Sequence, residues 1–261
     1  MTILMLGDVV GEPGLSVLER RLNDLKKEYR ADLTVVNGEN AAAGFGLTAD
    51  TLDRILAAGA DAVTGGNHIW EKRDFWPVLD SGKPVLRPAN FFDVPGHGNL
   101  RLEKNGFSVL IINLQGREQM TPIDCPFRTF DSIVEKEKAA GGKADIIAVD
   151  FHAESSEEKE ALAYYLDGRA GIVAGTHTHV QTADERILPR GTAYITDLGM
   201  TGAGNGIIGM DSEICIRRAY SQVAHRMECA VPASEKDSII QGIAVELDEQ
   251  GRAVNIGRIN R

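Results

Sequence analysis

The chain has 261 residues, of which 43% are hydrophobic and 25% are charged, and its formal net charge is −10. This composition is typical of a folded domain with a substantial core, and it excludes a disordered or fibrous chain. The negative charge argues against stable nucleic-acid binding, and no stretch of about 20 apolar residues is present to cross a membrane. We expect a single domain over residues 1–261, located in the cytoplasm because no signal-peptide core is recognisable.

The N-terminal part of the chain alternates strand-like and helix-like segments. An apolar run over residues 2–6 predicts a strand, and leucines spaced by three and four between residues 15 and 25 predict the helix after it. A second strand is predicted over residues 33–36. It is followed by a helix that Thr48 can cap and that Gly59 can end. This repeat is typical of an α/β protein.

The remainder of the chain adds buried-looking strands and a closing hairpin. The predicted strands cover residues 62–64, 107–114, 146–149, 172–174 and 193–196. Ser155 and Glu158 have the spacing of a capping box at the start of a helix that runs to Leu166. Residues 239–259 predict a β-hairpin with its turn at residues 248–251. Because early strands alternate with helices and later ones look antiparallel, we expect a mixed two-sheet α/β sandwich flanked by helices.

The glycine-rich run at residues 204–209 spells the dinucleotide-binding fingerprint. It lies late in the chain and leads into residues 210–212 without a clear helical face, so we reject that interpretation. A substrate loop and an ordinary turn remain equal alternatives. Substrate specificity is expected from the loops at residues 87–90, 115–117 and 201–206, but their sequences do not identify the substrate. The three cysteines are widely spaced and are expected to be free thiols.

Side chains that bind metals follow five of the predicted strands. They are Asp8, Glu39 with Asn40, Asn67 with His68, His152, and the pair His177 and His179. Ligand crevices of open α/β sheets lie at the carboxyl ends of strands, so we expect these side chains to meet. Their mixture of nitrogen and oxygen suits iron, manganese or zinc better than calcium or magnesium.

Two metals about 3.5–4 Å apart can clamp a phosphoryl group and activate water, and such a pair needs a bridging carboxylate. Glu39 is the best candidate, because small residues around it allow close backbone approach, and Asp8 would be a terminal ligand. The simpler alternatives are that Asp8 caps the helix beginning near Gly14 and that Glu39 is a solvated loop acid. His97 and His225 stand alone and are interpreted as structural.

The strand-end segments together resemble the calcineurin-like binuclear metallophosphoesterases, and closely their bacterial YmdB-like branch. The matching segments are residues 7–11, 37–41, 65–70, 150–154 and 175–179. The broad superfamily has a histidine where Val10 stands and an aspartate where Glu39 stands. The resemblance implies that Asp8, Glu39, Asn40 and His179 bind one metal, whereas Glu39, Asn67, His152 and His177 bind the other.

The resemblance also implies an activity. Family members include phosphodiesterases for cyclic nucleotides, notably 2′,3′-cyclic ones, often with iron or manganese. His68 directly follows a predicted ligand, so it could lie over the phosphate as the general acid for the leaving alkoxide, as it does in the family. We therefore expect hydrolysis of a small-molecule phosphodiester, 2′,3′-cyclic or 3′,5′-cyclic, through attack by a hydroxide that the metals activate.

Two rival functions stay open at the level of the sequence. One is a metal-binding sensor or regulator with little turnover. The other is a mononuclear metallohydrolase of amides or esters, which needs about three protein ligands and an open position. A homo-oligomer is compatible with the sequence.

Overall fold

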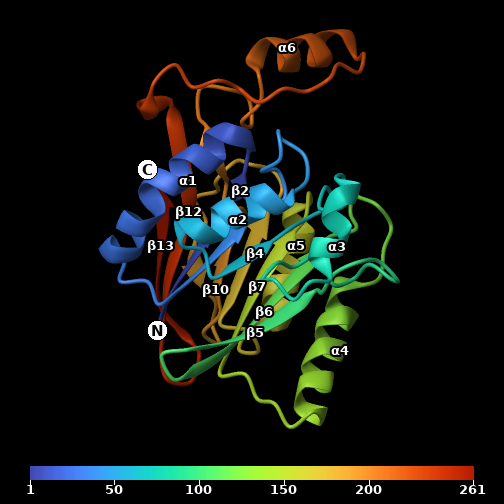
Figure 1. The fold of residues 1–261 in the computed structure, drawn as a ribbon. Helices are drawn as coiled ribbons and strands as arrows, with labels where there is room; N and C mark the ends of the chain where they lie inside the picture. Colours follow the sequence, from blue (N-terminus) through green and yellow to red (C-terminus); the bar gives the residue numbers. More distant parts are fainter.

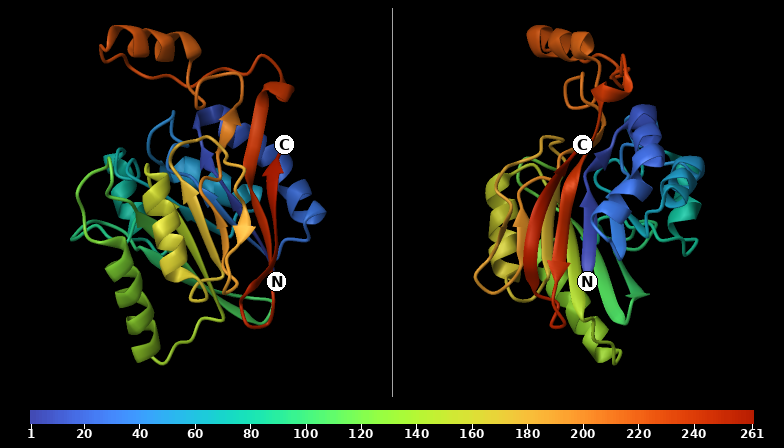
Figure 2. Two further views of the ribbon diagram at one scale, coloured as in Figure 1. Left: turned by 180° about the vertical axis from the view of Figure 1, so that it is seen from behind. Right: turned by 90° about the vertical axis from the view of Figure 1, so that its left-hand side faces the viewer.

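The chain folds into two β-sheets that pack face to face, with helices on their outer sides (Figures 1 and 2). This computed structural model describes all residues from Met1 to Arg261. The first sheet has seven strands in the order β2-β11-β12-β1-β3-β4, with β13 beside β12. They are β1 (Thr2–Leu6), β2 (Asp8–Val9), β3 (Leu33–Asn37), β4 (Ala62–Thr64), β11 (Met200–Ala203), β12 (Ser238–Leu247) and β13 (Ala253–Asn260).

The second sheet has six strands in the order β5-β6-β7-β8-β10-β9. They are β5 (Asn99–Lys104), β6 (Phe107–Gln115), β7 (Ile146–His152), β8 (Ile172–Thr176), β9 (Arg186–Ile187) and β10 (Ala193–Ile195). Within it, β6, β7, β8 and β10 run parallel, whereas β5 and β9 are antiparallel edge strands. In the first sheet β1, β3 and β4 are parallel and β12 is antiparallel to β1. The expected mixed two-sheet sandwich is confirmed.

Alternation along the central strands builds the core on both faces of each sheet. In β1, Ile3 and Met5 belong to the cluster between the two sheets, whereas Leu4 and Leu6 belong to the cluster under the outer helices. Both faces are buried, so the strand appears in the sequence as one apolar run. The helices are α1 (Gly11–Glu28), α2 (Ala49–Ala58), α3 (Trp76–Leu79), α4 (Pro126–Ala139), α5 (Ser156–Leu166) and α6 (Ser212–Ser221), with 3₁₀ turns at Arg73–Phe75 and Glu235–Asp237.

The expected helix ends are present, with two corrections. Thr48 caps α2 and Gly59 ends it in a left-handed conformation. Ser155 accepts a hydrogen bond from the Glu158 backbone N–H, but the Glu158 carboxylate does not return to Ser155 and instead accepts from the backbone of Arg117. Contrary to expectation, a helix does follow the glycine-rich run: α6 begins at Ser212, capped by Asp211, yet none of its residues is buried.

None of the helices combines the length and apolar character needed to cross a bilayer.

Candidate metal centre

The strand ends that carry the predicted ligands meet at one edge of the sandwich. In the first sheet β3 and β4 are in parallel register at Asn37 and Thr64, so Glu39 and Asn67 follow at the same level. In the second sheet the register pairs His152 with Thr176, and His177 comes next. Parallel strands deliver their carboxyl ends to the same edge, which explains why side chains distant in sequence converge here.

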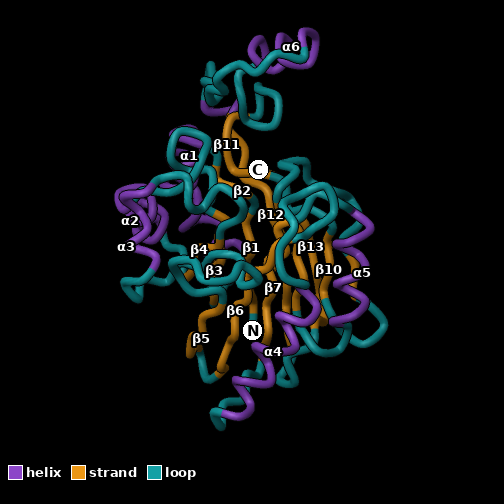
Figure 3. The backbone as a smooth tube through the Cα atoms, turned by 90° about the vertical axis from the view of Figure 1, so that its right-hand side faces the viewer, coloured by secondary structure: helices purple, strands orange, loops and turns teal.

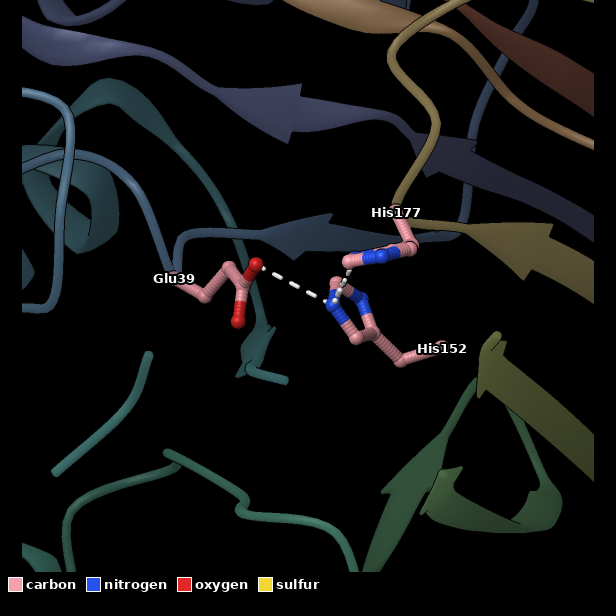
Figure 4. Close-up of side chains that lie close together, drawn as sticks. All are labelled: Glu39, His152 and His177. Carbon is pink, nitrogen blue, oxygen red and sulfur yellow. Dashed lines mark hydrogen bonds and ion pairs between the residues drawn. The ribbon is translucent and has the colours of Figure 1, made fainter. Parts of the chain in front are cut away.

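One group of side chains converges on the His152 imidazole. Its Nε2 atom lies 3.1 Å from Glu39 Oε1, 3.0 Å from Asn67 Oδ1 and 3.0 Å from His177 Nδ1. Figure 4 shows the carboxylate and the two imidazoles turned toward one another. Metal bonds of about 2.0–2.2 Å place neighbouring ligand atoms roughly 3 Å apart, so these separations fit one cation.

A second group adjoins the first through Glu39. His179 Nε2 lies 3.0 Å from the side-chain amide of Asn40 and 3.7 Å from Asp8 Oδ1. The same amide lies 3.2 Å from Glu39 Oε1, the oxygen that also contacts His152. One carboxylate oxygen therefore touches both groups, which is the position of a bridging ligand.

Two features show whether these residues fit a pair of metal ions: buried oxygens that lack a hydrogen-bond partner, and the close approach of the Gly66 backbone to the cluster. Asp8 Oδ1 and Asn40 Oδ1 are buried without a hydrogen-bond partner. Buried polar atoms are normally paired, and a cation would satisfy them. A Cβ on Gly66 would lie only 2.3 Å from both Glu39 Oε2 and His152 Nε2. The donor set, the orphaned oxygens and the space kept by Gly66 fit two metal ions.

Hydrogen bonds on the far side of the imidazoles orient their metal-facing nitrogens. His179 Nδ1 lies 2.9 Å from the Ile208 carbonyl oxygen, a contact that requires a proton on Nδ1 and leaves Nε2 as the acceptor nitrogen, facing the Asn40 amide. His152 Nδ1 lies 3.0 Å from Thr176 Oγ1, which donates to Asp150 Oδ1 at 2.7 Å. Such partners fix the tautomer of a metal-binding histidine. Asp150 lies within β7, and no role was predicted for it from the sequence.

Charge in the cluster is carried mainly by Glu39 and His152. Burial opposes ionisation of both groups, but their mutual attraction outweighs it, lowering the pKa of Glu39 to about 2 and raising the pKa of His152 to about 9. Burial raises the pKa of Asp8 to about 6, and burial together with nearby His152 lowers the pKa of His177 to about 3. In the metal-free protein a proton on His152 therefore occupies part of the space suited to a cation.

The turn that carries His177 and His179 is held by a buried ion pair. Both histidines have positive φ, 104° and 64°, which is unusual for residues with a side chain. Between them, the Thr178 hydroxyl donates to Asp197 Oδ2 at 2.8 Å. The same oxygen accepts from Lys159 Nζ at 2.8 Å, and both charged side chains are 1% exposed. Neither Asp197 nor Lys159 was among the residues that the sequence pattern indicated.

His68 lies beside the cluster rather than within it. Its backbone N–H donates to Glu39 Oε2 at 3.1 Å, and its Nδ1 lies 3.3 Å from Glu71 Oε1. The imidazole packs edge-on against Phe45 and lines a cavity of about 370 Å³ together with Glu39 and His177. This places an imidazole at the wall of the cavity in front of the cluster.

The structural alternatives for Asp8 and Glu39 do not hold. The N-cap of α1 is Val10, without a side-chain hydrogen bond, so Asp8 caps no helix there. Glu39 is 1% exposed and is not a solvated acid. His97 lines a different cavity, beside Arg87, and the three cysteines are free, as expected.

A two-sheet sandwich with such side chains at its strand ends is the fold of the calcineurin-like metallophosphoesterases. A solved structure described as a novel phosphatase of Mycoplasma pneumoniae superposes with a TM-score of 0.91 at 34% identity, covering 100% of this chain and 93% of the other. A solved Thermus thermophilus protein described as hypothetical gives a TM-score of 0.92 at 41% identity, covering 100% and 99%.

The sequence model of the YmdB-like protein family matches residues 4–259, so the chain belongs to that family. A relative from Bacillus subtilis (strain 168), named 2′,3′-cyclic-nucleotide 2′-phosphodiesterase, is 45% identical over 261 residues, which cover 99% of this chain and 96% of the relative.

Proposed function

We propose that this protein hydrolyses small phosphodiesters, 2′,3′-cyclic nucleotides first among them, at a centre of two metal ions. The reaction class is that of the phosphodiesterase from Bacillus subtilis. The observation that carries the proposal for this chain is that one Glu39 oxygen touches both ligand groups. The proposed ligands are Asp8, Glu39, Asn40 and His179 for one ion, and Glu39, Asn67, His152 and His177 for the other.

The metals would be iron or manganese, with zinc as the alternative, because nitrogen and oxygen donors are mixed. When bound, such a pair polarises the phosphate and lowers the pKa of a water nucleophile. The cavity of about 370 Å³ supports a small substrate, since ligand pockets span roughly 300–1,000 Å³. A mononucleotide with a cyclic diester, 2′,3′ or 3′,5′, is of suitable size.

His68 would deliver the proton that the leaving alkoxide needs. With Nδ1 beside the Glu71 carboxylate, Nε2 is the nitrogen that remains for the substrate, and the residue lines the cavity. The Glu71 carboxylate accepts from Nδ1–H and so fixes the tautomer of the ring, as an orienting acid does for a catalytic histidine. The backbone bond to Glu39 Oε2 keeps His68 at a constant position relative to the proposed bridging ligand.

The test is the His68→Ala variant, assayed on 2′,3′-cyclic, 3′,5′-cyclic and linear diesters after metal analysis. Turnover is expected to fall by about 10²–10⁴-fold, as for loss of a general acid, while two metals per chain are retained. Glu39→Gln is the matched comparison and is expected to lose metal and activity together. Metal loss from His68→Ala would place His68 in the coordination sphere instead, and undiminished turnover would remove its proposed role. Full metal occupancy without hydrolysis of any diester would favour the sensor.

A further inference from the structure

A second cavity lies between α4 and the loop at residues 87–99. Its volume is about 690 Å³, and it shares no lining residue with the cavity in front of the metal centre. Helix α4 packs against β6 of the second sheet, at the opposite end of the molecule from α6 (Figures 1 and 3). The proposed reaction uses none of the side chains in this cavity.

The cavity carries an excess of positive charge. Three of its cationic side chains form no ion pair, and they are Arg87, Arg128 and Lys136. Two acids also line it, but Glu137 is paired with Arg101, so only Asp124 opposes the three cations. The chain as a whole has a formal net charge of −10. A cationic cavity in an acidic protein indicates a ligand that carries negative charge.

Arg87 is held in a fixed orientation by the loop. Its Nε donates to the Gly96 carbonyl oxygen at 3.1 Å and its Nη1 to the Pro88 carbonyl oxygen at 2.9 Å, which leaves Nη2 without a partner. Burial lowers the pKa of the Arg87 guanidinium, whereas Asp80 raises it, although the Asp80 carboxylate itself accepts from the Gly96 backbone. An arginine oriented in this way is suited to donate to a phosphate oxygen.

Phe92 adds an exposed aromatic ring to the same cavity. Its side chain is 87% exposed, and its neighbour Phe91 also lines the cavity. Aromatic rings beside cations bind nucleotides by stacking on the base while the cations hold the phosphate. The volume is within the range of small-ligand pockets. We propose that this cavity is a second ligand site, which binds a nucleoside monophosphate with its phosphate on Arg87, Arg128 and Lys136 and its base against Phe92.

A nucleoside monophosphate is also what hydrolysis of a cyclic nucleotide diester releases. The ligand is therefore the class of product expected from the proposed function, and this link to the reaction rests on that function. The binding itself does not, because none of the proposed metal ligands lines the cavity.

Calorimetric titration of the full chain with adenosine 3′-monophosphate tests the site. With Mn²⁺ present, two binding events are expected, one at the metal centre and one in this cavity. With chelator, the cavity event is expected to remain. Loss of all binding in chelator would overturn the proposal. A titration that shows only the metal-independent event would support the cavity site and count against the proposed function.

Arg128→Gln tests the phosphate contact in the presence of chelator. Nucleotide binding is expected to weaken by about tenfold, because one charged hydrogen bond to the phosphate is lost. Lys138→Gln is the matched control, because Lys138 is an exposed cation on the same helix that does not line the cavity. Equal weakening in the two variants would show a general effect of net charge and overturn the site.

Phe92→Ala separates the base from the phosphate. Binding of adenosine 3′-monophosphate is expected to weaken by about tenfold through loss of stacking, whereas binding of inorganic phosphate is expected to stay unchanged. Phe92→Tyr should keep the affinity of the wild type. Unchanged nucleotide affinity in Phe92→Ala would overturn the assignment of a nucleotide to the cavity.

Trp70 provides a readout of where the ligand binds. Its ring lies 4.7 Å from that of Phe91, centroid to centroid, and its Nε1 donates to the Pro95 carbonyl oxygen at 3.2 Å. The chain has two tryptophans, so Trp76→Phe leaves Trp70 as the only one. Its fluorescence is expected to change with the midpoint of the calorimetric titration in chelator. Nucleotide binding that leaves the fluorescence unchanged would place the ligand elsewhere.

Discussion

At the residue scale, Gly66 marks the closest approach of the backbone to the proposed ligands. Its φ is not positive, so alanine is compatible with the backbone, but an added Cβ would lie 2.3 Å from Glu39 Oε2 and from His152 Nε2. Both side chains are buried, so neighbouring atoms restrict how far they can move. The methyl group must therefore displace a carboxylate and an imidazole that belong to the cluster.

Gly66→Ala is expected to lower turnover by about 100-fold or more, since displacements near 1 Å can have effects of that size. Bound metal is expected to fall with it, because two ligands move together. Metal content and turnover of the purified variant measure both effects. Gly257→Ala is the control, because a Cβ there meets no atom within 4 Å. Equal losses in the two variants would show a general effect of replacing glycine.

The sequence indicated which residues belong to the site better than it indicated what supports them. The eight chemistry-bearing residues could be selected because each follows an apolar strand, and the structure brings all of them to one edge. Gly66 was not singled out from the sequence, because its close contact with His152 comes from another sheet. Asp150 and Glu71 were missed for the same reason: their roles depend on partners that three-dimensional packing supplies.

At the element scale, the connection after β8 has to hold two histidines in an uncommon backbone conformation. Asp197 accepts from both the backbone N–H and the hydroxyl of Thr178, and Lys159 compensates its charge in the interior. A buried ion pair contributes little net stability, but it can fix one geometry. The pair is therefore placed to position the turn.

Thr178→Val tests this element, because valine keeps the shape of threonine and removes only the 2.8 Å hydroxyl bond to Asp197. Metal affinity is expected to fall by about tenfold, with a loss of folding stability of only about 1 kcal/mol. Thr178→Ser retains the hydroxyl and should restore the affinity. Calorimetric titration and thermal unfolding separate the two effects. Equal affinities for the valine and serine variants would show that the hydroxyl does not position the turn.

Elements that bury a face were predictable, and those that do not were missed. The central strands appear as apolar runs because both faces are covered, and α1 shows its leucine spacing because one face lies on the first sheet. In α4 only Pro126 and Phe130 are buried, and in α6 no residue is, so neither helix has a strong apolar period. The two-residue strand β2 depends on pairing with the distant strand β11, and the two-residue strand β9 on a local pairing with β10, rather than on their own composition.

At the scale of the whole molecule, the proposed ligands come from both layers of the sandwich. Asp8, Glu39 and Asn67 follow strands of the first sheet, whereas His152 and His177 belong to the second. A metal bound by both groups is a link between the layers that the unfolded chain lacks. Metal should therefore stabilise the native state by mass action, by about 2.7 kcal/mol at 100 times the dissociation constant.

This stabilisation is expected to grow as pH rises from 6 to 9. The pKa of His152 is raised to about 9, so below that pH a proton must leave before its nitrogen can bind metal, whereas Asp8, with a pKa of about 6, is ionised over most of this range. If metal binding displaces one proton, the apparent metal affinity rises about tenfold per pH unit. The stabilisation by metal then grows by about 1.4 kcal/mol per pH unit, which raises Tm by roughly 3–5 °C. Below pH 6 protonation of Asp8 should make the dependence steeper.

Scanning calorimetry at fixed Mn²⁺ concentration, with and without chelator at each pH, isolates this increment from the pH dependence of the metal-free protein. His68→Ala should retain the full increment, because its imidazole lies outside the ligand set, whereas Glu39→Gln should lose it. An increment that stays constant from pH 6 to pH 9 would mean that metal does not compete with a proton on His152. Loss of the metal-induced stabilisation in His68→Ala would show that His68 is a metal ligand rather than a proton donor.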